Sequence, residues 1–282
     1  MKAVILTSDR SSQRALATKL AQVCDVTAIV LSKNVPKRKK PPLERARLLG
    51  TSVAARSVGY PLVRAWQRML KRYEAAYPAF PTSRLVRVRN VNDPASVETI
   101  ASLSPDVVIV SGTNLVGKGI LKAAAGSRGV LNLHTGISPY VKGGPNCTNW
   151  CLADGLFHLI GSTVMWLDLG IDTGDIIATE RAPLHFGESL DDLHWKVMEH
   201  AHDLYVRVVR GMAEGRDLAR VPQGDIAVGR TYYSLEWTAR PIARALFKYA
   251  RSWSPELKND ANFLRAWADT RLVPPPIPPA TE

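Results

Sequence analysis

The 282-residue sequence has only three cysteines, and it has no apolar run of the eighteen or so residues that a membrane-spanning helix needs. Cys24, Cys147 and Cys151 are too few and too unevenly spaced for a disulfide framework, which agrees with a reducing compartment. The first residues enter a strand pattern directly, so no signal peptide is indicated. These shortages exclude a disulfide-stapled or membrane-spanning protein. We therefore expect a cytoplasmic protein, whose 46% hydrophobic content can fill a full core.

Acidic residues are scarce between Lys33 and Arg89, where fifteen Lys and Arg stand against two acids. The segment carries +13, so the remainder of the chain carries −1 of the net charge of +12. Positive charge concentrated in this way indicates an anionic partner, such as a nucleotide, a phosphorylated acceptor, RNA or an acidic membrane surface. Charge alone does not choose among these partners.

The chain alternates between strand and helix patterns, beginning with strand, helix and strand over residues 2–7, 11–23 and 25–31. Further strands are expected at 85–89, 106–111, 129–133, 159–167 and 175–181, with helices from residue 94 and over 117–124. The pattern predicts an α/β fold with a Rossmann-like, mostly parallel sheet. Because only a short turn separates the last two strands, they are an antiparallel addition to that sheet.

Two helices are predicted from apolar residues spaced three and four apart. Ser189 caps a long helix that ends at Gly215. The other helix starts near Pro61, after a helical segment that breaks at Gly59. One of its faces is apolar, formed by Leu62, Trp66, Met69, Leu70 and Tyr73. The other face is basic, formed by Arg64, Arg68, Lys71 and Arg72. This basic amphipathic helix is interpreted as packed on the domain with a solvated charged face, the alternatives being membrane contact and capture of an anionic acceptor.

Three regions are expected along the chain. Residues 1–220 form a catalytic domain with a basic helical insertion at 33–89. Residues 221–272 form a small C-terminal extension containing a short strand and a second basic helix. Residues 273–282 are rich in proline and are expected to be a disordered tail.

Two short polar signatures lie close together in the sequence. They are Asn132-Leu-His134 and Leu169-Gly-Ile-Asp-Thr-Gly-Asp175, and each is flanked by an apolar run that reads as a strand. Because α/β proteins present their chemistry at the C-terminal ends of strands, the two signatures predict an enzyme site.

The signatures and their surroundings resemble the formyltetrahydrofolate-dependent formyltransferase family, which includes methionyl-tRNA, glycinamide ribonucleotide and sugar N-formyltransferases. The resemblance rests on residues 129–140, 143–145, 163–168 and 170–175, and it extends over about residues 106–215. It implies the formyltransferase fold and formyltetrahydrofolate as co-substrate. It also implies a catalytic triplet of Asn132, His134 and Asp172. Folate contacts are implied for Gly136, Ile137, Ser138, Pro139, Gly170 and Ile171.

These residue types suit formyl transfer to an amine. Attack on the formyl carbon makes its oxygen anionic, and the Asn132 amide and a protonated His134 would donate hydrogen bonds to it. Asp172 would hold the charge on His134 and relay a proton from the amine to the departing folate nitrogen. The alternatives are a core histidine at His134, an Asx-turn at Asp172, and Asp168 in place of Asp172. Gly170 and Gly174 would let the backbone approach the pterin.

The acceptor is expected to be the amine of a nucleotide-linked sugar. Methionyl-tRNA is the alternative, because the tRNA branch of the family also has a basic loop after its second strand. Against tRNA, the residues after the long helix lack the series of alternating strands that would form that branch's C-terminal barrel. A non-catalytic anion-binding protein is the rival from another class. Cys147 and Cys151 lack further ligands nearby, so no metal is expected. Peripheral membrane contact and a homodimer stay open.

Overall fold

The centre of the molecule is a seven-stranded sheet in the order β3-β2-β1-β4-β5-β7-β8. The computed structural model describes residues 1–35, 55, 57–82 and 84–279. The strands are β1 (Lys2–Thr7), β2 (Asp25–Ser32), β3 (Leu85–Val88), β4 (Val107–Val110), β5 (Val130–His134), β7 (Gly161–Trp166) and β8 (Ile176–Arg181). The first five are parallel, and β7 is antiparallel to both β5 and β8. The mostly parallel sheet with an antiparallel addition is therefore confirmed.

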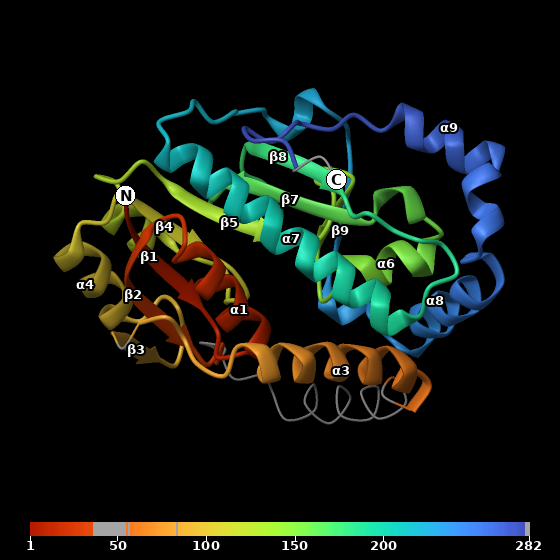
Figure 1. Cartoon of the computed structure of the whole chain (residues 1–282), viewed down its shortest axis with the longest axis horizontal. Helices are drawn as coiled ribbons and strands as arrows, with labels where there is room; N and C mark the ends of the chain where they lie inside the picture. The colour runs from red at the N-terminus through yellow and green to blue at the C-terminus, as the bar shows by residue number, and fades with distance from the viewer. Residues whose placement is uncertain (36–54, 56, 83, 280–282) are drawn as a thin grey trace.

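Helices cover both faces of this sheet (Figure 1). The helices α1 (Ser11–Leu20) and α7 (Leu190–Ala213) pack on one face through one apolar cluster. The other face is covered by α4 (Pro94–Leu103) and α5 (Lys118–Ala123) through a second cluster. Strands buried on both faces read as continuous apolar runs, as in the fully buried Val107–Val110.

The long helix α7 begins and ends where the sequence predicts. Ser189 is its N-cap and its Oγ accepts a hydrogen bond from the Asp192 backbone N–H at 3.1 Å. Gly215, with φ of +78°, follows its last turn in the left-handed conformation that favours glycine. In its middle, the fully buried Tyr205 donates its hydroxyl to the Leu131 carbonyl at 2.8 Å, which ties α7 to β5.

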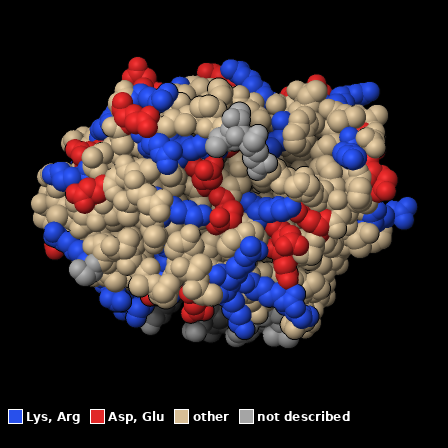
Figure 2. Space-filling view, viewed as in Figure 1, with Lys and Arg blue, Asp and Glu red and all other residues tan. Residues whose placement is uncertain are grey.

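The basic helix α3 (Tyr60–Ala76) packs beside α1 and α7, with Met69 and Tyr73 buried against Ala15 and Met198. Its basic side chains are exposed, and Lys and Arg gather over α3 on the lower part of the face in Figure 2. The structure thus agrees with the packed-helix interpretation. The helix expected before Gly59 lies largely outside the described residues, as does most of the proline-rich basic loop.

The chain after α7 packs back onto the catalytic fold. There, β9 (Arg230–Tyr232) pairs in parallel with the short strand β6 (Val141–Gly143) that follows β5. Helix α8 (Ala239–Ser252) packs on α6 (Cys147–Asp154), and α9 (Ala261–Asp269) joins the same apolar cluster. A boundary at residue 220 stays a prediction.

Residues 273–279 belong to the tail that is expected to be disordered, and in the structure they contact β8 and α7. The Thr179 backbone N–H donates to the Val273 carbonyl at 2.7 Å, and the Val273 N–H donates to Thr179 Oγ1 at 2.7 Å. Farther on, the Arg207 guanidinium donates to the Ile277 carbonyl at 2.9 Å. Prolines retain carbonyl acceptors, so a proline-rich segment can still be fixed by donors on its neighbours.

In the described part of the chain, no helix is long and apolar enough to cross a membrane.

Candidate active site

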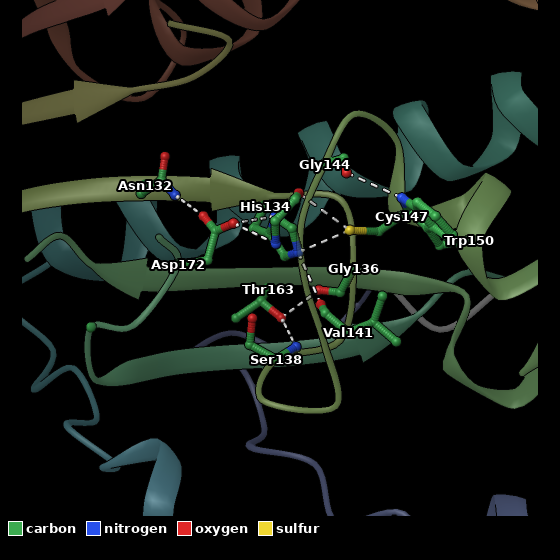
Figure 3. Close-up of polar contacts among 12 residues, drawn as sticks. Asn132, His134, Gly136, Ser138, Val141, Gly144, Cys147, Trp150, Thr163 and Asp172 are labelled. Atoms are coloured by element: carbon green, nitrogen blue, oxygen red, sulfur yellow. Dashed lines mark hydrogen bonds and ion pairs between the residues drawn. The ribbon is translucent and has the colours of Figure 1, made fainter. Parts of the chain in front are cut away.

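The two polar signatures meet at the end of β5 (Figure 3). They lie beside a cavity of about 470 Å³. Asn132 and His134 lie two positions apart on this strand, so their side chains leave the same face of the sheet. Asp172 comes from the loop between β7 and β8 and lies between them. All three line the cavity, so the structure brings the predicted triplet together.

Asp172 contacts both other members of this triplet. Its Oδ1 accepts a hydrogen bond from Asn132 Nδ2 at 3.2 Å. Its Oδ2 lies 3.2 Å from His134 Nδ1 and accepts from the Gly143 backbone N–H at 3.0 Å. The Asp172 side chain is 16% exposed and that of His134 is 7% exposed. One edge of the carboxylate group therefore stays within reach of a ligand.

His134 is held in its protonated form. Its Nε2 lies 3.0 Å from the Val141 carbonyl, which can only accept, while its Nδ1 faces the Asp172 carboxylate. Both ring nitrogens therefore donate, as they do in an imidazolium. Burial lowers the pKa of His134, but the Asp172 charge opposes burial, and the net pKa is raised above the ordinary 6.5.

The Cys147 thiol lies behind this histidine, with Sγ 3.4 Å from His134 Nε2. Burial raises the pKa of Cys147, so the thiol stays neutral at neutral pH. It donates to the Gly143 carbonyl at 3.5 Å. Asp172 is thus the charge that stabilises the imidazolium.

The backbone of Asp172 is in the left-handed region, with φ of +51°, which is uncommon for any residue except glycine. Gln223 holds it there: its Nε2 donates to the carbonyls of Asp172 at 2.7 Å and of Gly174 at 2.9 Å. Gln223 is 8% exposed and lies in the segment that follows α7. Sequence reasoning missed it, because no local pattern links it to a turn some fifty residues earlier.

An Asx-turn was the alternative interpretation of Asp172, and in the structure it is Asp168 that forms this turn. Its Oδ1 accepts hydrogen bonds from the Gly170 N–H at 2.9 Å and from Thr173 Oγ1 at 2.7 Å. A Cβ on Gly170 would lie 1.8 Å from Thr173 Oγ1, so the turn itself requires glycine there. Both residues line the cavity, but the Asp168 carboxylate bonds within the loop whereas the Asp172 carboxylate contacts Asn132 and His134.

The residues with implied folate contacts divide into two groups. Gly170 and Ile171 line the cavity, but Gly136, Ile137, Ser138 and Pro139 do not. Ile137 and Ser138 are buried, and a Cβ on Gly136 would lie only 2.6 Å from His134 Nε2. The loop at 136–139 therefore packs behind the imidazole, and its contact with folate stays a prediction.

Thr163 on β7 fixes this loop. Its Oγ1 donates to the Gly136 carbonyl at 2.7 Å and accepts from the Ser138 N–H at 2.9 Å. Thr163 is fully buried, so these bonds are shielded from water. They set the distance at which the loop supports His134.

The cavity also has walls that sequence reasoning missed. Residues 111–116, directly after β4, form one side of it. Their polar start, Ser-Gly-Thr-Asn after a buried strand, is a strand-end signal of the kind that identified Asn132. Other additions include Arg10 before α1, Trp66 of α3, and Tyr233 after β9, which come from distant parts of the chain. Within the described residues, no three His, Cys, Asp or Glu side chains group as metal ligands would.

A family model described as formyl transferase matches residues 2–209. The chain belongs to the formyl transferase family. The matched region contains the sheet, most of α7 and the whole catalytic triplet.

Sequence relatives in this family include two methionyl-tRNA formyltransferases. The one from Syntrophus aciditrophicus is 32% identical over 136 residues, which is 48% of this chain and 42% of that protein. The one from Clostridium tetani is 30% identical over 124 residues, covering 44% of this chain and 39% of that protein. The matched region thus spans less than half the length of either relative.

Solved structures of the family share the fold. A sugar N-formyltransferase from a Shewanella species gives a TM-score of 0.55 at 13% identity, covering 87% of this chain and 88% of that one. A glycinamide ribonucleotide transformylase from Symbiobacterium toebii gives 0.51 at 18% identity, covering 78% and 94%. The predicted formyltransferase fold is therefore confirmed.

Proposed function

We propose that this protein is an N-formyltransferase that moves a formyl group from formyltetrahydrofolate to an amine. The observation that carries the proposal is the hydrogen-bonded group of Asn132, His134 and Asp172 at the cavity, in a chain of the formyl transferase family. A protein that only bound an anion would gain nothing from a buried imidazolium paired with a carboxylate.

The side chains divide the work of the transfer. As the amine nitrogen bonds to the formyl carbon, the formyl oxygen gains negative charge. Asn132 uses one amide hydrogen on Asp172, and its second, which no described residue accepts, can donate to that oxygen. The bond from carbon to the folate nitrogen then breaks. Asp172 accepts the proton lost by the amine and returns one to the departing nitrogen.

His134 acts chiefly on Asp172 in this arrangement. Both of its ring nitrogens are already bonded, one to Asp172 and one to the Val141 carbonyl. A direct hydrogen bond from His134 to the formyl oxygen would cost one of these contacts. The imidazolium instead holds the Asp172 carboxylate in place and adds positive charge near the oxygen.

The cavity suits the folate part of the donor. Gly112 and Thr113 offer backbone groups on one side, and Gly170 does so on the other. Leu115 and Ile171 add apolar surface. A pterin has flat apolar faces and a hydrogen-bonding edge, which is the combination that such walls bind. These residues would hold the donor beside Asn132.

For the acceptor we propose a nucleotide-linked amino sugar. Support comes from Arg10, a cation on the wall of the cavity at its β1 end, which suits a phosphorylated small molecule. The second candidate is methionyl-tRNA, which the names of the sequence relatives favour.

The test is to incubate the protein with formyltetrahydrofolate and a panel of amino-sugar nucleotides and charged tRNA, following formyl gain by mass. We expect a sugar nucleotide to gain the formyl group.

Asp172→Asn should lower kcat by about 10²–10⁴-fold. Asp175→Asn, in the same segment, is the control and should leave kcat unchanged. Gain by tRNA alone would reject the sugar, and equal turnover in both variants would reject the site.

A further inference from the structure

A second cavity, of about 360 Å³, opens at the carboxyl ends of β1 and β2, and we name it the β2 cavity. Its walls are residues 8–10 after β1, residues 31–34 at the end of β2, and Arg87 on β3. None of the catalytic triplet lines it. Parallel strands that end together leave a crevice of this kind, where α/β proteins bind ligands.

The β2 cavity adjoins the catalytic cavity. Arg10 lines both. The partition between them is held by hydrogen bonds across the ends of β2 and β4. Asn34 Nδ2 donates to the Gly112 carbonyl at 3.1 Å, the Asn114 N–H donates to Asn34 Oδ1 at 3.0 Å, and Ser32 Oγ donates to Asn114 Oδ1 at 3.2 Å. Arg10 is thus the residue at which the two cavities adjoin.

The charge of the β2 cavity is positive. Arg10, Lys33 and Arg87 line it, and among the described residues none of them forms an ion pair. Among the described residues of the wall, Asp9 is the one acid, and it is paired with Arg14 at 2.9 Å. Three cations thus line a space in which none of the acids that the structure describes neutralises them.

A buried polar atom points to a ligand independently of the charge. Ser8 lines the β2 cavity and is 6% exposed, and its Oγ has no hydrogen-bond partner among the residues that the structure describes. Buried hydroxyls are normally paired, so an orphan on a cavity wall suggests a partner supplied from outside. A phosphate oxygen would accept from it.

The spacing of the sheet fits an extended acceptor. Two strands, β4 and β1, lie between the catalytic strand β5 and β2. At about 4.8 Å per strand, β2 lies about 14 Å from β5. A sugar with its amine at Asp172 and a diphosphate joined to it would have to span about this distance.

We propose that the β2 cavity binds the diphosphate of a nucleoside diphosphate that forms the tail of the acceptor. The inference rests on the proposed formyl transfer for the identity of the acceptor. Arg10 and Arg87 supply forked donors and Lys33 a point charge, the groups that proteins use for phosphate.

The test is calorimetric titration of the folate-free protein with UDP and with inorganic diphosphate at fixed salt. Both should bind, and uridine should not. Lys33→Gln and Arg87→Gln should each weaken binding by about tenfold or more, the effect of losing a charged hydrogen bond. Arg84→Gln, an exposed arginine just before the same strand β3 but outside the β2 cavity, should bind as the wild type does.

Equal binding by the two cavity variants and the control would overturn the proposal. So would binding of an RNA acceptor stem without binding of either diphosphate ligand. Because no folate is present, the outcome is independent of formyl transfer. A protein that binds UDP in this way yet formylates no amine would retain the site and lose the proposed function.

Discussion

A proton on His134 connects the stability of the site to its activity. The pKa of this histidine is lowered by burial and raised further by Asp172, with a net rise above 6.5. Because the folded-state pKa is the higher one, the pair stabilises the fold fully below about pH 6.5, the unfolded-state value. That contribution is lost as pH rises through the folded-state pKa.

The matching prediction concerns Asp172→Asn. Without the carboxylate charge, burial dominates, and the pKa of His134 should fall below 6.5. An NMR titration of the imidazole signals measures this directly, with wild type titrating on the alkaline side of neutrality and the variant on the acid side. Identical titration of the two proteins would show that Asp172 does not control the proton.

Gln223 should matter for turnover although it lies outside the triplet. Gln223→Met keeps the length of the side chain but removes both donors to the Asp172 loop. We expect kcat to fall about tenfold or more, since small misplacements of a catalytic group are costly. The KM for folate should change little, and the alkaline limb of the pH profile should shift if Asp172 moves away from His134. Gln67→Met, exposed on α3, is the control, and equal kcat in both variants would contradict a positioning role.

Residues of the site were predictable to the extent that they follow a strand in the sequence. Asn132 and His134 lie at the end of an apolar run, and Asp172 lies in a glycine-flanked turn. Gln223 has neither signal, because its role depends on where the chain returns after α7. The loop at 136–139 closely follows His134 in the sequence, but its packing behind His134 depends on Thr163, which is an ordinary strand residue in the sequence.

At the scale of elements, α3 supplies one aromatic side chain, Trp66, to the cavity wall. Trp66 also meets the buried His194 edge to face at 6.1 Å. Because Trp66 and Arg10 line the same cavity, Trp66→Ala should raise the KM for the acceptor about tenfold while leaving that for folate unchanged. Val63→Ala, exposed on the same helix, is the comparison. Equal rises in both KM values for Trp66→Ala would indicate general loosening instead.

Elements with one buried face were predictable, and elements buried all round or paired at long range were not. The cap, apolar stripe and final glycine of α7 are all visible in the sequence. Helix α6 is buried on every side except at its last residue, so it has no polar face to give periodicity. Strands β6 and β9 are three residues each and pair across nearly ninety positions, which no local pattern records.

For the whole molecule, the dependence of acceptor binding on salt should separate the two candidate acceptors. A diphosphate neutralised by a few cations releases few counterions, so its affinity should fall gently as salt rises. An RNA that contacted the wider basic surface would show a much steeper fall, in proportion to the number of phosphates bound. Measuring KM for the acceptor at several salt concentrations tests this, and a steep slope would favour tRNA.

Two later segments of the chain contact the edge strand β8, and these contacts affect whether copies of this protein can associate through that edge. An edge strand offers unpaired backbone groups on which a second chain can build. Here that edge is occupied at two points, by Val221 opposite Ile176 and by Val273 opposite Thr179. We therefore expect the proline-rich segment to block pairing of β8 with a strand of a second chain. Chains that lose this segment should aggregate at concentrations at which the full chain remains dispersed.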